Sequence, residues 1–169
     1  MIEDKLRELS IDIPTPPSPA GSYIPVVTTG NLAFVSGQIP MKEGKVVFEG
    51  KVPEKQSLDS ARDAAKICII NGLAQLKANL GSLDKITKFV RISGFVNSSP
   101  EFTEQPKVIN AASDLLVEIF GDMAKHSRIA VGVASLPLNS SRLIGSPFKE
   151  APPRGSPLTL GDRLQGTHL

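Results

Sequence analysis

The amino-acid sequence predicts an α+β domain in which a mixed β-sheet carries two helices packed on one face. Two stretches have apolar residues at helical spacing, and several shorter stretches alternate or are rich in β-branched residues. Glycine and proline separate these stretches. Their order is three strands, helix, strand, helix, strand, so the helices are expected to cover the buried face of one sheet.

The expected strands share branched or aromatic residues and flanking turn residues, and they cover 24–28, 32–36, 45–49, 86–96 and 129–136. Thr29-Gly30-Asn31 lies between the first two, which predicts a hairpin. The pattern is longest over 86–96, which predicts one continuous strand there. Pro137 closes the strand at 129–136.

The two expected helices are marked by residues suited to their ends. Ser57 can cap a helix whose apolar positions run from Leu58 to Leu80, and Gly81 stands where a C-terminal cap belongs. Pro106 is allowed in the first turn of the second helix, and Gly121 ends it. Both helices present one apolar face, as packing on a sheet requires.

One folded domain is expected between two proline-rich ends. Residues 1–19 are predicted to form a short helix over 1–9 and then an extended proline-rich arm. Residues 20–148 form the domain. Residues 149–169 are polar, rich in proline and glycine and without periodicity, which predicts a disordered tail.

Composition excludes several function classes. The 19 Lys plus Arg against 17 Asp plus Glu leave a net charge of +2, which does not favour nucleic-acid binding. No run of about 18 apolar residues occurs, so we expect no membrane partners. Residues 1–5 are acidic and polar, which does not suit a signal peptide, so we expect a cytoplasmic protein. With no common cofactor motif, one Cys and two His, no metal or cofactor is expected. Cys68 lies on the apolar stripe of the first long helix, which predicts a buried structural thiol.

Four local features could carry chemistry, and they are Gly21-Ser22-Tyr23, Ser36-Gly37-Gln38-Ile39-Pro40, Asn110 and His126-Ser127-Arg128. A strand that ends in glycine lets a ligand approach backbone amide donors. An arginine side chain can hold a carboxylate through two parallel hydrogen bonds. Each feature alone is weak.

In combination, three stretches resemble the RidA/YjgF family of reactive-intermediate deaminases, which is also known by the older name L-PSP endoribonuclease. The stretches are GSYIPVVTTGNLAFVSGQIP, VRISGFVNSSPEFTEQPKVINAASDLLVEIFG and HSRIAVGVASLPLN, and together they extend from about residue 13 to about residue 141. GFVNS is typical of one branch of the family. The resemblance implies a chorismate-mutase-like fold, homotrimers with clefts between subunits, and hydrolysis of 2-imino and 2-enamino acids to 2-keto acids and ammonia without a cofactor.

The resemblance also implies roles for single residues. Arg128 matches the family's carboxylate-binding arginine, and the backbone amide of Ala130 would share the carboxylate. Tyr23 matches a cleft tyrosine that closes over substrate or orients water. The remaining matches are to residues that shape the cleft, and they are Ser36, Gly37, Gln38 and Asn110.

Each of these residues also has a plain structural interpretation. Arg128 could form an ordinary surface ion pair, and Tyr23 could be half-buried with a satisfied hydroxyl group. Ser36 and Gly37 could simply end a strand, and Asn110 could solvate its helix. His126 has a side chain suited to a general base, but family members vary at this position, which favours a loop histidine.

The chain departs from the family in its last strand. Family deaminases carry a glutamate there that positions the attacking water, whereas Leu143 occupies that position here. Gly145 and Pro147 are expected to weaken or shorten the strand. Imine hydrolysis is therefore the leading hypothesis, a catalytically inactive trimer that binds small carboxylates is the alternative, and endoribonuclease activity is the least favoured.

Overall fold

The computed structural model describes residues 1–16 and 21–150 of the chain. In chain order the helices and strands are α1 (Ile2–Glu8), β1 (Val26–Thr29), β2 (Leu32–Gln38), β3 (Met41–Lys42), β4 (Lys45–Val46), α2 (Leu58–Leu80), β5 (Ile86–Phe89), β6 (Arg91–Asn97), α3 (Gln105–Phe120), β7 (Ser127–Val133) and β8 (Arg142–Glu150). Short 3₁₀ turns lie at Leu83–Lys85, Gly121–Ala124 and Pro137–Asn139.

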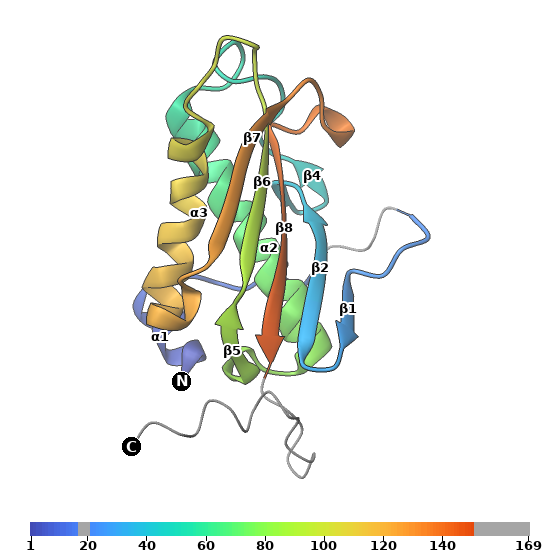
Figure 1. Ribbon diagram of the computed structural model, residues 1–169, viewed down its shortest axis with the longest axis vertical. Coiled ribbons are helices and arrows are strands. Elements are labelled where there is room, and N and C mark those ends of the chain that lie inside the picture. Colours follow the sequence, from blue (N-terminus) through green and yellow to red (C-terminus); the bar gives the residue numbers. More distant parts are fainter. Residues whose placement is uncertain (17–20, 151–169) are drawn as a thin grey trace.

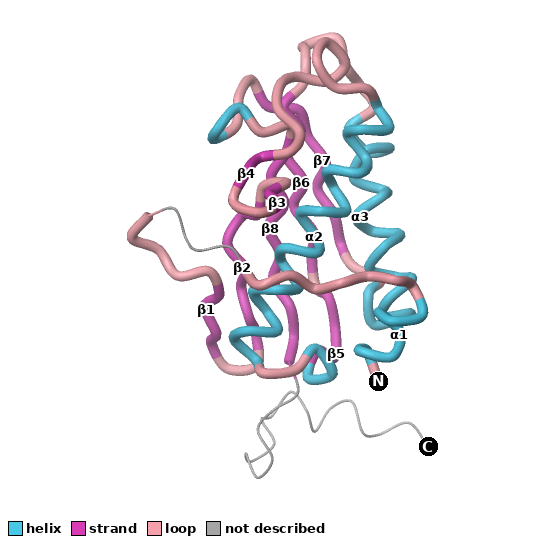
Figure 2. The backbone as a smooth tube through the Cα atoms, turned by 180° about the vertical axis from the view of Figure 1, so that it is seen from behind, coloured by secondary structure: helices cyan, strands magenta, loops and turns pink. Residues whose placement is uncertain are grey.

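The main sheet has the strand order β1-β2-β8-β6-β7, and β5 also pairs with β8. β6 and β7 are parallel and are connected through α3, while the other pairs are antiparallel, so the sheet is mixed. Figures 1 and 2 show α2 and α3 side by side on one face of this sheet. The predicted α+β class, a mixed sheet with two helices on one face, is confirmed.

The core lies between that face and the two helices. Phe89 of β5 is buried, and its ring centroid lies 4.7 Å from that of Phe120 and 4.8 Å from that of Phe148. Aromatic pairs at this separation stabilise a core beyond the area they bury. Phe120 ends α3 and Phe148 belongs to β8, so the rings join α3 to two strands of the sheet.

Both predicted long helices are confirmed, and the ends of α2 show why. The Ser57 side chain accepts a hydrogen bond from the backbone N–H of Ser60 at 3.1 Å, which satisfies a donor of the first turn. Gly81 has φ 81°, a left-handed conformation that glycine adopts without strain, and its N–H donates to the Lys77 carbonyl. Pro106 lies in the first turn of α3, as expected.

Several strand boundaries differ from the prediction. The expected strand at 45–49 is reduced to β4, which pairs only with β3 in a separate two-stranded sheet. The turn between these two strands contains Glu43 and Gly44 at φ 49° and 76°, which is the conformation of a tight two-residue hairpin turn. In addition, β1 begins at Val26 instead of residue 24, and β7 covers Ser127–Val133 instead of 129–136.

The expected continuous strand at 86–96 is wrong, because β5 and β6 are separated at Val90. The Val90 carbonyl accepts hydrogen bonds from the Ser127 backbone N–H at 3.1 Å and from the Ser127 hydroxyl at 2.9 Å. These bonds turn the Val90 carbonyl toward the start of β7. The break therefore coincides with the point where the parallel β7 joins the sheet.

The expected weakening of the last strand is also wrong. β8 has nine residues and lies inside the sheet, between β2 on one side and β5 and β6 on the other. Its ladder with β5 and β6 has no partner for Ser146 or Pro147, which lie opposite the break at Val90. A proline lacks the N–H donor, and here it falls where one of the two ladders is already interrupted.

The N-terminal segment belongs to the folded unit. Predicted helix 1–9 is confirmed as α1, whose Leu6 is buried in the core, and the Ile2 N–H donates to Asp84 Oδ1 at 2.7 Å. Figure 2 shows the segment after α1 crossing the outer side of α2 toward β1. Residues 17–20 of the expected arm and residues 151–169 of the expected tail lie outside the described residues, while residues 149 and 150 belong to β8.

Candidate functional site

Arg128 lies on β7, the edge strand of the sheet, and its side chain reaches α3. Its Nη1 donates to Asn110 Oδ1 at 2.7 Å and to Ser113 Oγ at 3.2 Å. The side chain is exposed, and neither of these partners carries a negative charge. Two neutral acceptors orient a guanidinium without neutralising it, so Arg128 keeps its positive charge available to an anion.

The backbone of β7 adds donors at the same edge. Ser127 N–H donates to the Val90 carbonyl, and the Val133 carbonyl accepts from Ser98 N–H, so residues 127 and 133 direct their polar groups toward the body of the sheet. Backbone groups alternate sides along a strand. The N–H of Ala130 therefore points to the free edge of β7, on the side from which a carboxylate can reach Arg128.

Packing of α3 explains why Asn110 and Ser113 meet Arg128. The two residues are separated by one helical turn and lie on the same side of α3. The opposite side of the helix is buried, and Ile109 fits against Gly94 of β6, where an added Cβ would lie 2.5 Å from Ile109 Cδ1. Glycine at this position lets α3 approach the sheet closely enough for these contacts.

His126 completes this group of side chains. Its Nδ1 is 2.5 Å from the Ala124 carbonyl oxygen, which can only accept, so Nδ1 carries the proton. Its Nε2, 3.1 Å from Ser113 Oγ, is then the acceptor of the serine hydroxyl. Burial lowers the pKa of His126; the Ala124 hydrogen bond opposes this effect, and the positive charges of Arg128 and Lys88 add to it.

A depression of about 270 Å³ lies over these residues, and it is lined by Ser113, Val117, Ala124, Lys125, His126 and Arg128. Its polar groups come from α3, from the end of the 3₁₀ turn and from β7. The sequence alone indicated Arg128 and named His126 as a loop histidine. It did not indicate Ser113, because a serine within a helix matches no motif; the only available signal was its place one turn after Asn110.

Tyr23 and Ser36 belong to a second group of residues, near the edge of the sheet that β1 forms. Ser36 on β2 fastens the segment before β1, since its hydroxyl donates to the Ile24 carbonyl and its N–H to the Pro25 carbonyl, both at 2.9 Å. This contact holds Tyr23 next to the start of β1, with 48% of its side chain exposed. Gly37 follows Ser36 and is exposed.

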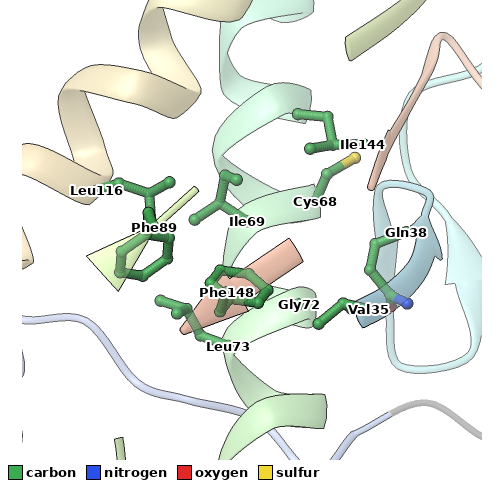
Figure 3. A pocket seen from close by; sticks show the side chains of 10 residues that line it. All are labelled: Val35, Gln38, Cys68, Ile69, Gly72, Leu73, Phe89, Leu116, Ile144 and Phe148. Atoms are coloured by element: carbon green, nitrogen blue, oxygen red, sulfur yellow. The ribbon is translucent and has the colours of Figure 1, made fainter. Parts of the chain in front are cut away.

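Gln38 lies differently from its predicted neighbours. It is buried, and its Nε2 donates to the Ser36 carbonyl at 2.9 Å. Figure 3 shows the Gln38 and Cys68 side chains among the apolar residues of α2, β2 and β8 around a void of about 10 Å³. A void of this volume holds at most one water molecule, so it leaves no room for a ligand beside Gln38. Because Gln38 donates to the Ser36 carbonyl, it supports the backbone of Ser36 from the interior. The predicted burial of Cys68 is confirmed.

A single copy of the chain does not bring the two groups together. β2 and β7 are separated by β8 and β6, so Ser36 and Arg128 are roughly 14 Å apart at the usual strand spacing. Tyr23 precedes β1 in the chain, and β1 is the opposite edge strand from β7 (Figure 1). The chain therefore carries two separate groups of candidate site residues. We call Arg128, Asn110, Ser113 and His126 the arginine half-site, and Tyr23, Ser36 and Gly37 the tyrosine half-site.

The position expected to hold a glutamate lies within β8. Leu143 pairs with Phe95 of β6 in the antiparallel register. The strand is therefore formed, and leucine stands at the position where the resemblance led us to expect a glutamate. Within residues 1–16 and 21–150, no three His, Cys, Asp or Glu side chains are grouped as a metal site requires, and no helix is long and apolar enough to cross a membrane.

The fold agrees with the comparisons to known proteins. Residues 3–148 match the family model described as "YjgF/chorismate_mutase-like, putative endoribonuclease". Protein TCP17 of Trypanosoma cruzi is 38% identical over 137 residues, which cover 80% of this chain and 86% of that protein. The chain therefore belongs to the YjgF/chorismate mutase-like family, as the sequence resemblance indicated.

Two solved structures are similar along most of their length. Protein Atu1372 of Agrobacterium tumefaciens, of unknown function, is 43% identical with a TM-score of 0.83, and the match covers 89% of this chain and 92% of that one. A Shewanella oneidensis protein described as a "putative endoribonuclease" is 31% identical with a TM-score of 0.85, and the match covers 88% and 99%. The chorismate-mutase-like fold is thus confirmed.

Proposed function

We propose that this protein hydrolyses reactive 2-imino and 2-enamino acids to 2-keto acids and ammonia. The observation that carries the proposal is Arg128, whose guanidinium is oriented by Asn110 and Ser113 without being neutralised. Such a group suits a substrate defined by a carboxylate next to the reacting carbon. Ala130 N–H at the same edge supplies a second donor to that carboxylate.

The active clefts are proposed to lie between subunits of a homotrimer. The arginine half-site and the tyrosine half-site lie at opposite edges of one sheet. They form a complete site when the β7 edge of one copy meets the β1 edge of the next copy. A rotation that closes after three copies produces three such clefts. Supporting this assembly, the face of the sheet away from α2 and α3 exposes large apolar side chains, namely Val27, Phe34, Ile129 and Val131.

In this assembly each residue has a defined task. Arg128 and Ala130 bind the carboxylate, and Asn110 holds the guanidinium in place. Tyr23 of the neighbouring copy closes over the substrate or orients water, and Ser36 and Gly37 form the cleft wall, with Gln38 behind them. The proposal needs no cofactor, since water is the only co-reactant, and it assigns the protein to the cytoplasm, where such imines arise.

A coupled assay tests the proposal. An amino-acid oxidase generates 2-imino acid, and trapping of the free imine with semicarbazide competes with its hydrolysis. The wild-type protein should lower semicarbazone formation and raise the rate of keto-acid release, and Arg128→Ala should remove both effects. Arg62→Ala, which changes an exposed arginine on α2, is the matched control and should act as wild type. No effect of the wild-type protein would reject the proposal.

A trimer that binds small carboxylates without turnover is the second candidate. The observation in its favour is Leu143, since this position of the last strand, where the family resemblance places a water-positioning glutamate, carries no carboxylate. Saturable binding of pyruvate in a calorimeter, lost in Arg128→Ala, together with no effect in the coupled assay, would favour this candidate. RNA cleavage, which the family description names, is the least favoured because the chain has a net charge of only +2 and 5% aromatic residues.

A further inference from the structure

We propose that Ser113 and His126 form a proton relay beside Arg128, and that this relay supplies the acid–base chemistry for which position 143 of β8 offers no carboxylate. This inference rests on the proposed imine hydrolysis and assigns a role to two residues for which the family resemblance implied none. Ser113 is the group that exchanges a proton at the reacting centre. His126 lies behind Ser113 and acts through it.

The hydrogen bonds give the relay a direction. Ser113 Oγ accepts from Arg128 Nη1 at 3.2 Å, so the serine hydroxyl proton is free to point elsewhere. His126 Nε2, 3.1 Å from Ser113 Oγ, is the acceptor in reach, because His126 Nδ1 donates to the Ala124 carbonyl. A histidine held in one tautomer by its second nitrogen is the usual arrangement of a general base behind a hydroxyl group.

The relay lies where the substrate must react. A carboxylate bound to Arg128 places the adjacent imine carbon within a few ångströms of the guanidinium. Ser113 Oγ touches the same guanidinium and lines the same depression of about 270 Å³ as His126. Ser113 can therefore reach the reacting carbon through one water molecule, which is the range in which general bases act.

The chemistry balances with water as the only co-reactant. The water oxygen attacks the imine carbon, a C–O bond forms, and the C=N π electrons move to nitrogen, which takes up a proton from solvent. The proton lost by the water passes to Ser113 Oγ while the serine proton moves to His126 Nε2. As the carbinolamine collapses, the C–N bond breaks and His126 returns its proton through Ser113 to the leaving ammonia. The carbonyl forms as the hydroxyl proton is released to solvent, which balances the proton that nitrogen took up in the first step.

The surrounding charges keep His126 in its basic form at neutral pH. Arg128 on β7, Lys88 on β5 and Lys125 next to His126 face or flank the ring, while the 3₁₀ turn contributes the Ala124 carbonyl. Burial and the positive charges of Arg128 and Lys88 lower the pKa of His126, so the neutral ring predominates. The rate of imine hydrolysis should consequently fall on the acid side of its pH profile, where His126 becomes protonated and can no longer accept the serine proton.

Two variants test the relay by the coupled assay. His126→Gln and Ser113→Ala should each lower kcat about 100-fold. In His126→Gln, KM should change less than threefold, because both acceptors of Arg128 remain. His126→Gln should also abolish the acid limb of the pH–rate profile, measured relative to spontaneous hydrolysis. Ser113→Thr keeps the hydroxyl and should recover much of the rate. A purely structural role would not move the acid limb.

A second measurement follows His126 directly. Nitrogen NMR of the wild-type protein should show the tautomer protonated at Nδ1, and addition of pyruvate should shift the Nε2 resonance, but not in Ser113→Ala. A tautomer protonated at Nε2, or an active wild type whose two variants keep kcat and the acid limb, would overturn the relay alone. A wild-type protein without any effect on imine hydrolysis would instead reject the proposed function and the relay together.

Discussion

Replacement of Gly94 tests whether close packing of α3 on β6 sets the geometry around Arg128. A Cβ at this position would lie 2.5 Å from Cδ1, 2.7 Å from Cγ1 and 3.2 Å from Cγ2 of Ile109. Ile109 is fully buried, so it cannot swing into solvent to make room. In Gly94→Ala, α3 must therefore move away from the sheet, or Ile109 must leave its preferred rotamer.

The cost of such overpacking is about 1–3 kcal/mol of unfolding free energy. For a chain of this length we expect the Tm to fall by about 3–10 °C, measured by calorimetry. Gly72→Ala is the matched control. Gly72 lies within α2, and a Cβ added there would meet only Gln38 Cγ, at an ordinary contact distance of 3.8 Å. Removing a glycine from a helix should raise stability by about 0.5–1 kcal/mol.

A double-mutant cycle separates the steric effect from other causes. Ile109→Ala removes the three atoms that the new Cβ would strike, so Gly94→Ala should cost less in that background than in the wild-type protein. An unchanged Tm in Gly94→Ala, or equal costs in both backgrounds, would refute the packing argument.

Three further predictions concern the half-sites and the assembly. Asn110→Ala removes the 2.7 Å acceptor of Arg128 and should raise KM about tenfold with kcat retained, whereas Glu118→Ala on the exposed side of α3 should leave both unchanged. The pKa of His126 is lowered in the folded state, so the unfolded state binds more protons at acidic pH. The free energy of unfolding should therefore fall as the pH drops below about 6.5. Denaturant titrations at several pH values should show a smaller fall in His126→Gln. Equal pH slopes would contradict this. If the proposed trimer buries the exposed Val131, Val131→Asp should yield monomers in sedimentation experiments and abolish activity, and a trimer that persists would argue against burial of this face.

Much of the fold could be predicted because its signals are local. The limits of α2 follow from Ser57 and Gly81, whose capping roles depend on their own backbone conformation. Strand limits were less accurate, because they depend on distant partners. The break at Val90 coincides with hydrogen bonds from the distant Ser127, which no pattern within 86–96 can show.

Pro147 illustrates the same limit. The residue indicated a weakened strand, yet β8 tolerates it opposite the gap that Val90 leaves between β5 and β6. Whether a proline disrupts a strand depends on which neighbouring groups need its missing N–H, and these belong to other elements.

The candidate site was predicted in part. Arg128, Asn110 and Tyr23 were found through the family resemblance, and the structure adds the contact between the first two. The connection of Ser113 to His126 arises only when α3 packs beside β7, so no spacing in the sequence could indicate it. The separation of the two half-sites depends on strand order and was likewise visible only in the structure.

Activity of mixed trimers tests the central claim that each site combines Arg128 of one copy with Tyr23 of the next. Arg128→Ala and Tyr23→Ala each damage every site in their own homotrimers. When the two variants are co-expressed and mix at random, about a quarter of the clefts should join an intact arginine half-site to an intact tyrosine half-site. We predict that keto-acid release recovers to about a quarter of the wild-type rate, whereas no recovery in verified mixed trimers would contradict a site shared between subunits.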